Sequence, residues 1–315
     1  MTTPEELSLA HSLADPIKSV RDQALRGLGV FVRSSSEVSD LEMLKFWKGL
    51  YYCLWLSDKV PVQQELVASL ARLVHECPSE ERVCQFLKCF FQTMMREWAC
   101  LDQYRVNKFY SLLRMVLRQT LHYLHQRRWP RLSVETIFRV LCEEVLSKTP
   151  NGPRLHYADI YLAELFEVTK GEVVTGNMLT LLSPWLLLLS ADKSADSSFK
   201  DRIAEKVFVK FATDRAVECG GDGGGGVFLK CRSGAVQLAI FNAASADNTL
   251  ELNRKRLYEI HKAFQKTTGE DFATEQEDDL NTASTEQELE GAAKKRKTEK
   301  EDSQQKRRKK HIVGQ

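Results

Sequence analysis

Long apolar runs and a secretion signal are both missing from this chain of 315 residues. The nearest approach to a membrane span, residues 179–189, is interrupted by Ser183 and Pro184 and falls short of the roughly 20 residues that cross a bilayer. The first residues, MTTPEELSLAHSLAD, carry acids where a signal peptide carries a basic segment. These absences predict a protein without a membrane anchor or a secretory leader.

Signals for catalysis and for bound cofactors are also lacking. The eight cysteines contain no CxxC pair and the seven histidines no HExxH motif, so the sequence predicts reduced, buried thiols and no metal. No GxSxG elbow is present. The glycine run at residues 219–226 lacks the GK[ST] of a phosphate-binding loop and is expected to be a flexible loop. We therefore expect no enzyme, no cofactor and no small-molecule substrate.

Alternation typical of strands is absent as well, and helix signals replace it. Asp15 and Pro16 form an N-cap pair, and Ser39 with Glu42 forms a capping box. Asp102 is a candidate N-cap for a long helix ending at His125. Helices are predicted over residues 15–33, 39–56, 61–75, 79–98, 102–125, 133–146, 175–189, 195–212, 228–241 and 250–264. One more helix, ending at residue 168, is predicted to follow a turn at residues 150–153.

Short connections between these helices favour antiparallel hairpins. A run of hairpins that are apolar on one or two faces predicts an all-α fold, a HEAT-like α-α superhelix, with a bundle of two subdomains as the alternative. This solenoid is expected over residues 1–264. Residues 265–315 have a composition that cannot bury a core, so they are expected to be a disordered tail.

Charge is distributed unevenly, although the formal net charge is only +2. Residues 82–139 hold eleven Lys and Arg against three acids, residues 265–290 nine acids against one Lys, and residues 291–315 ten basic residues against three acids. Two clusters in the last segment are spaced like a bipartite nuclear import signal, and basic clusters also contact RNA phosphates. The predicted import residues are Lys294, Lys295, Arg296, Lys297, Lys306, Arg307, Arg308, Lys309 and Lys310.

The long helix after Asp102 is predicted to carry an apolar face and an opposite basic face. Past its end, Trp129 stands among arginines, a mixture suited to unpaired RNA, although Trp129 could instead close the end of a hairpin. A solvated helix face is the alternative for Arg114, Arg118, His122 and His125. The RNA-binding candidates are Lys108, Arg114, Arg118, His122, His125, Arg127, Arg128 and Arg131.

Aromatic residues gather earlier in the chain. Trp47, Tyr51 and Trp55 follow each other at four-residue intervals and so share one helical face. Aromatic side chains anchor protein interfaces, which makes this face a candidate for partner docking. The same spacing describes a core stripe, and that alternative is favoured.

Three longer segments carry a resemblance to a known family. The segments WKGLYYCLWLSDK at 47–59, followed by Gln64-Glu65-Leu66, FQTMMREWACLDQYRVNKFYSLLRMV at 91–116 and PNGPRLHYADIYLAEL at 150–165 are similar, in this order, to signatures of the ribosomal RNA-processing protein 1 family. The resemblance covers roughly residues 5–212.

The resemblance implies an all-helical nucleolar protein of large-subunit ribosome assembly, acting in precursor rRNA maturation without cutting RNA. Expected partners are precursor rRNA of the large subunit and other assembly factors. Two alternatives remain: a nuclear adaptor solenoid that binds acidic segments or helices of other proteins, and an RNA-processing enzyme. Salt dependence and partner identity separate the first two, and RNA cleavage by purified protein would establish the third.

Overall fold

The computed structural model describes residues 12, 15, 17–33, 38–190, 196–218 and 228–268, with the backbone alone for residues 215–218 and 268. Within these ranges the chain forms helices and no strand, which confirms the predicted all-α class. The main helices are α2 (Lys18–Arg33), α3 (Asp40–Leu56), α4 (Val60–Arg72), α5 (Glu80–Glu97), α6 (Val106–Gln126), α7 (Arg131–Leu141), α8 (Asn151–Thr169), α9 (Thr175–Ser190), α10 (Ser197–Ile203), α11 (Lys210–Glu218), α12 (Ser233–Ser245) and α13 (Glu251–Thr268).

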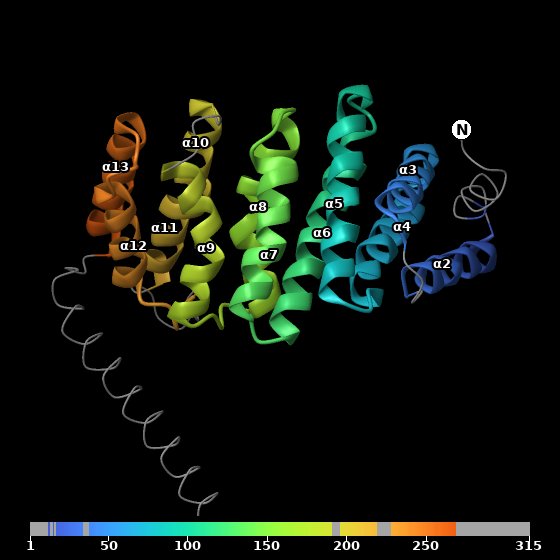
Figure 1. Ribbon diagram of the computed structural model, residues 1–315, viewed down its shortest axis with the longest axis horizontal. Helices are drawn as coiled ribbons and strands as arrows, with labels where there is room; N and C mark the ends of the chain where they lie inside the picture. Colours follow the sequence, from blue (N-terminus) through green and yellow to red (C-terminus); the bar gives the residue numbers. More distant parts are fainter. Residues whose placement is uncertain are drawn as a thin grey trace, which may run out of the picture. The chain divides into compact units, whose positions relative to one another are not determined.

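Helices that alternate along the chain lie in the same layer. In one layer α3 packs against α5, α5 against α7, α7 against α9 and α9 against α12. In the other, α4 packs against α6, α6 against α8 and α8 against α10. Figure 1 shows the resulting hairpins standing side by side, each in contact with its neighbours. This arrangement is a solenoid of helical hairpins, as predicted.

Helix beginnings follow the local signals in most places. The capping box is present, because Ser39 Oγ accepts from the Glu42 amide while the Glu42 side chain accepts from the Ser39 amide. Asp102 behaves differently from the prediction. Its Oδ1 accepts from the amides of Tyr104 and Arg105 and closes a turn, so that α6 starts only at Val106.

Several predicted helices contain a change of helical geometry. A 3₁₀ turn (Leu73–Glu76) follows α4, a π-helical turn (Cys142–Leu146) follows α7, and a second one (Ala204–Val209) joins α10 to α11. The last two helices also shift: α12 starts at Ser233, and α13 continues to Thr268, past the predicted end of the solenoid domain.

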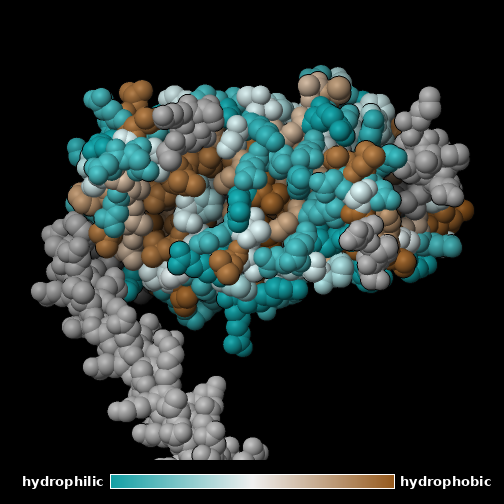
Figure 2. Space-filling view, in the orientation of Figure 1, coloured by the Kyte–Doolittle hydropathy of each residue, from teal (hydrophilic) through white to brown (hydrophobic). Residues whose placement is uncertain are grey.

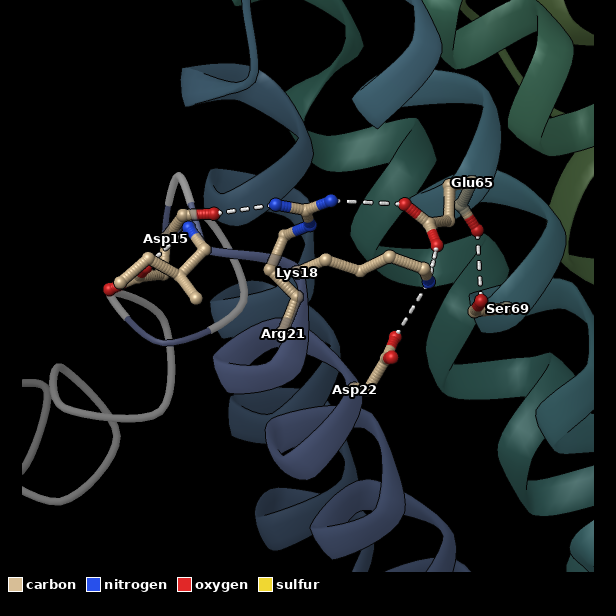
Figure 3. A network of polar contacts seen from close by, with 7 residues as sticks. Asp15, Lys18, Arg21, Asp22, Glu65 and Ser69 are labelled. Carbon is tan, nitrogen blue, oxygen red and sulfur yellow. Dashed lines mark hydrogen bonds and ion pairs between the residues drawn. The ribbon is translucent and has the colours of Figure 1, made fainter.

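An ionic network joins α2 to the first hairpin (Figure 3). Arg21 donates to Glu65 Oε2 on α4 at 3.1 Å and to the carbonyl of Asp15 at 2.9 Å. Lys18 adds an ion pair to the same carboxylate and another to Asp22. Glu65 therefore holds α2 against α4, which gives a structural reason for the Gln64-Glu65-Leu66 segment.

Large apolar side chains fill the space between the two layers, among them Trp47, Tyr157, Tyr161 and Trp185, none of them more than 1% exposed. On the face shown in Figure 2, hydrophilic residues are interspersed with smaller hydrophobic areas. Among the residues described, no helix is long and apolar enough to cross a membrane.

Candidate functional site

The first sequence signature reaches the core through Trp47, which is fully buried. Its indole nitrogen donates to the carbonyl of Phe86 at 3.0 Å. Its ring packs on Phe86 and Phe90 of α5, with centroids 4.8 and 4.7 Å away. A buried indole with its one donor satisfied is fixed in place, so Trp47 joins α3 to α5.

The other two docking candidates are placed nearby. Tyr51 is 2% exposed, stacks on Phe109 at 4.5 Å and donates to the carbonyl of Glu97 at 3.3 Å. Trp55 is half-buried, and the Arg105 guanidinium covers one face of its ring at 4.1 Å. The docking prediction is therefore wrong for Trp47 and Tyr51, whose spacing reflects the core alternative. Sequence reasoning missed the exposed apolar residues Leu56, Val60 and Tyr104.

Lys108 is 7% exposed, which corrects its assignment as a phosphate ligand. Its ammonium donates to the carbonyls of Trp55 at 2.7 Å and Ser57 at 2.8 Å. These carbonyls lie at the C-terminal end of α3, where peptide oxygens lack helical donors and the helix dipole favours a cation. Burial lowers the pKa of the Lys108 ammonium from its ordinary value. The side chain thus caps α3 and joins it to α6.

Arg114 and Arg118 share a buried acid on the neighbouring helix. Glu164 of α8 is 1% exposed; its Oε2 accepts from Arg118 Nε at 2.5 Å, and its Oε1 lies 3.3 Å from Arg114 Nη1. The predicted basic face opposite the apolar one is wrong for this pair. A solenoid helix is packed on more than one side, and α6 has α4 on one flank and α8 on the other. Both guanidinium groups are partly exposed, at 44% for Arg114 and 28% for Arg118.

One histidine of the predicted basic face, His122, lies in surroundings that disfavour its charged form. Burial, together with the neighbouring His75, His125 and Arg118, lowers the pKa of His122 from its ordinary value. The His125 ring lies 5.5 Å from the Trp129 ring and is half-buried.

The connection between α6 and α7 gathers the remaining RNA-binding candidates. The amide of Trp129 donates to the carbonyl of Leu124 at 3.0 Å, and the amide of Arg128 to that of His125 at 2.9 Å. This pair of bonds is a Schellman motif, with Arg128 at the position that glycine usually occupies. Accordingly Arg128 has φ 61° and Trp129 φ 57°. A left-handed conformation costs a residue with a Cβ roughly 1 kcal/mol or more.

Around this connection, the side chains divide into buried rings and exposed guanidinium groups. Trp129 is 7% exposed and Tyr123 is 4% exposed, so neither ring is open to stacking, and Trp129 closes the hairpin end. Arg127 lies over the Tyr123 ring at 3.6 Å. Arg128 is exposed, and Arg131, also exposed, pairs with Glu135 at 2.8 Å.

The third signature packs against the second at the start of α8. Gly152 lies so close to Trp98 that an added Cβ would be 2.6 Å from the indole nitrogen, and 3.1 Å from the hydroxyl of Tyr110. His156 Nε2 lies 3.2 Å from the carbonyl of Tyr110. The three signatures therefore form one continuous framework.

Sequence reasoning did not predict the contacts that three residues make between helices. These residues are Glu65, Gly152 and Glu164. The sequence does contain a signal for Glu164. This acid shares the buried side of α8 with the apolar residues Tyr161, Leu165 and Val168. For Gly152 no local signal distinguishes a close approach from a loop glycine. The predicted import residues, Lys294–Lys297 and Lys306–Lys310, lie outside the described residues. Within the described ranges, no group of three or more metal-binding side chains is placed to hold an ion.

Comparison with known proteins gives relatives with one shared description. Ribosomal RNA processing protein 1 homolog A of Mus musculus is 37% identical over 213 residues, which are 65% of this chain and 43% of that protein. The human homolog B is 37% identical over 213 residues, 65% of this chain and 28% of the relative. The human homolog A is 30% identical over an aligned length of 354, gaps included, which covers 91% of this chain and 76% of the relative. The chain thus spans less than half the length of the first two of these relatives.

A family model extends the likeness to almost the entire sequence. The model described as nucleolar protein Nop52 matches residues 4–314. Its match includes α2 to α13 and the segments whose side chains form the framework described above. The chain therefore belongs to the Nop52 family of nucleolar proteins, together with the ribosomal RNA processing protein 1 homologs.

Proposed function

We propose that this protein is a non-catalytic scaffold in precursors of the large ribosomal subunit, where rRNA processing depends on it. The names of its relatives, which refer to ribosomal RNA processing, support the broader role in ribosome biogenesis. The observation that carries the proposal is the framework itself. The family-like segments hold three hairpins together through Trp47, Lys108 and Gly152.

A scaffold of this kind works by presenting surfaces at fixed distances. Each layer of hairpins has an outer side, so one side can contact rRNA phosphates while the other contacts proteins. The partners in this proposal are precursor rRNA of the large subunit and other assembly factors. The location is the nucleolus, in agreement with the nucleolar description of the family.

The decisive experiment replaces the endogenous protein by a degradable copy. After depletion, late precursors of large-subunit rRNA should accumulate, whereas small-subunit rRNA should remain normal, and the protein should cosediment with large-subunit precursors. Re-expression of the wild-type chain is the control. Selective loss of small-subunit rRNA, or no cosedimentation with any precursor, would contradict the proposal.

Nuclear import is proposed to depend on the two basic clusters between Lys294 and Lys310. Deletion of residues 291–315 should move the protein towards the cytoplasm and leave the melting temperature nearly unchanged. A nuclear import signal fused to the truncated chain should restore the location. Unaltered nucleolar accumulation of the deletion variant would assign import to another segment or to a partner.

The exposed apolar residues around the first hairpin favour the second candidate function, a nuclear adaptor that binds proteins only. Tyr104 is 84% exposed, Val60 59% and Leu56 55%, and large exposed apolar side chains are typical of interfaces. An adaptor should retain its partners after RNase treatment and at high salt. Release of the partners by RNase would favour the rRNA-bound scaffold.

A further inference from the structure

Basic residues between Arg82 and Arg139 fall into two groups once their partners are known. Lys88 pairs with Asp40 at 2.9 Å, Arg96 with Glu97 at 3.1 Å, and Arg105 with Asp102. Lys108 caps α3, and both Arg114 and Arg118 reach Glu164. Within the part of the chain that the structure describes, Arg127 and Arg128 have no acid within 4.0 Å. Arg139, which is exposed, bonds within the described ranges only to Thr136 Oγ1 at 3.5 Å. Arg127 and Arg128 are thus two adjacent basic residues without an acidic partner among the residues described, and residues 127–131 are here called the α6–α7 corner.

The backbone of the α6–α7 corner is unusual in the same place. Among the residues described, Arg128 and Trp129 are the only two consecutive non-glycine residues with positive φ, at 61° and 57°. Glycine at position 128 would complete the Schellman motif without this cost. The exposed side chain of Arg128 therefore stands at a position where glycine would have no conformational cost.

The chemistry of the α6–α7 corner is that of a phosphate site rather than a base-reading site. Arg127 is held in place by its stacking on Tyr123 and by a bond from Nη1 to the Tyr123 carbonyl at 3.2 Å. A guanidinium group fixed in this way loses little entropy when it binds an oxyanion. Two carboxylates lie near: Glu135 pairs with Arg131, and Glu80 accepts from Ser133 Oγ at 2.5 Å. The three guanidinium groups of Arg127, Arg128 and Arg131 thus outnumber these two carboxylates.

Base stacking requires an open aromatic face, and the corner has none among its described residues. The rings of Tyr123 and Trp129 are both buried. With no ring open to stacking, the groups that the corner offers are guanidinium groups, which match the oxygens of phosphates. Contacts to phosphates carry no sequence information.

We propose that the α6–α7 corner binds the phosphate backbone of precursor rRNA through Arg127, Arg128 and Arg131, without preference for base. This inference rests on the proposed function, because it locates the rRNA contact of the scaffold. It also moves that contact away from Arg114 and Arg118, whose charges Glu164 partly neutralises.

The test uses the full chain and two single-stranded RNA probes of equal length, oligouridylate and oligoadenylate. Arg128→Gly removes the guanidinium group and also the cost of holding a residue with a Cβ in the left-handed conformation. The melting temperature should therefore stay equal or rise. Affinity at low salt should fall about five- to tenfold, the equivalent of one net hydrogen bond of ordinary strength. The log–log salt slope should weaken by about 0.7, the value for one phosphate on a single strand. Both probes should respond equally.

Two further variants keep the comparison specific. Arg128→Asn tolerates the left-handed conformation and should lose affinity to the same extent as Arg128→Gly. Arg26→Ala removes the same charge from an exposed position of α2 and should leave the affinity and the slope unchanged. The basic tail is present in every variant, so its contribution cancels.

The possible failures are distinguishable. If the wild-type chain binds neither RNA, two proposals are contradicted: that the protein contacts rRNA, and that the α6–α7 corner makes this contact. If the wild type binds RNA and Arg128→Gly has the same affinity and salt slope, the corner alone is overturned and the contact lies elsewhere. A strong difference between the two probes would overturn the backbone-only mode of recognition.

Discussion

Single residues in this protein often act as connections between helices rather than as surface groups. Lys108 shows this most clearly, because a buried ammonium satisfies two carbonyls at the end of α3 from a position on α6. Its role follows from the geometry of a helix end, where oxygens without donors attract a cation.

Replacing Lys108 by methionine tests this role. Lys108→Met keeps the length of the side chain but leaves the Trp55 and Ser57 carbonyls without their donor, so the free energy of unfolding should fall by about 2–3 kcal/mol. Lys48→Met, at an exposed position of α3, is the matched control and should change stability by no more than about 0.5 kcal/mol. Chemical denaturation measures both. Equal effects would show that Lys108 does not cap α3.

The pair of arginines on Glu164 supports a second prediction at this scale. Glu164→Gln leaves the shape of the site but removes the charge that Arg118 and Arg114 share, and stability should fall by about 1–2 kcal/mol, since both guanidinium groups are partly solvated. In double-mutant cycles, Arg118→Met should couple to Glu164→Gln more strongly than Arg114→Met does, because Arg118 is closer and less exposed.

The control for this pair lies on the same helix. Asp159 pairs with Arg202 at 3.3 Å, and both side chains are 39% exposed, so Asp159→Asn should cost less than about 1 kcal/mol. Stronger coupling to Arg114 than to Arg118 would contradict the assignment.

At the scale of elements, the contact between the second and third hairpins depends on the absence of a side chain. Gly152 lets the first turn of α8 approach Trp98 and Tyr110. Because Trp98 is itself 9% exposed and packed on Tyr110 at 5.0 Å, it has little space to move away.

Gly152→Ala should therefore lower the free energy of unfolding by about 1–3 kcal/mol through overpacking. Gly176→Ala is a matched control, since Gly176 lies in the first turn of α9 and an added Cβ there meets nothing within 4 Å. It should be neutral or stabilise by about 0.5 kcal/mol, because alanine is the better helix former. Equal melting temperatures of the two variants would show that α8 shifts freely against Trp98.

Elements also show which part of the structure the sequence could predict. The capping box of Ser39 and Glu42 involves residues three apart, and it was predictable because such contacts depend on local sequence alone. The partners of Arg118 and Lys108 are 46 and 51 residues away, and they depend on which helices become neighbours. Helical periodicity identifies an apolar face, but it does not show that α6 is flanked on two sides, and so it placed Arg114 and Arg118 on a free face.

At the scale of the whole molecule, the helices α12 and α13 complete the core at the C-terminal end of the solenoid. The last two helices are not additions to a finished solenoid. On α13, Leu257 and Phe264 are fully buried and Ile260 is 2% exposed. Phe264 stacks on Phe211 of α11 at a centroid distance of 6.2 Å, and the Asn253 amide donates to the carbonyl of Ser190 at the end of α9 at 3.0 Å.

A chain that ends after residue 218 should therefore be markedly less stable than one that ends after residue 270. Burying each large aliphatic or aromatic side chain contributes about 1.5–3 kcal/mol, so losing the apolar face of α13 should cost about 5 kcal/mol. In a domain of this size, that cost corresponds to a fall of about 10 °C or more in melting temperature, with aggregation through the uncovered Phe211. Differential scanning calorimetry and light scattering measure the two effects. Equal stability of the two truncations would mean that the first 218 residues fold without α12 and α13. The longer chain is the internal control, because it retains α13 and lacks only the segment beyond it.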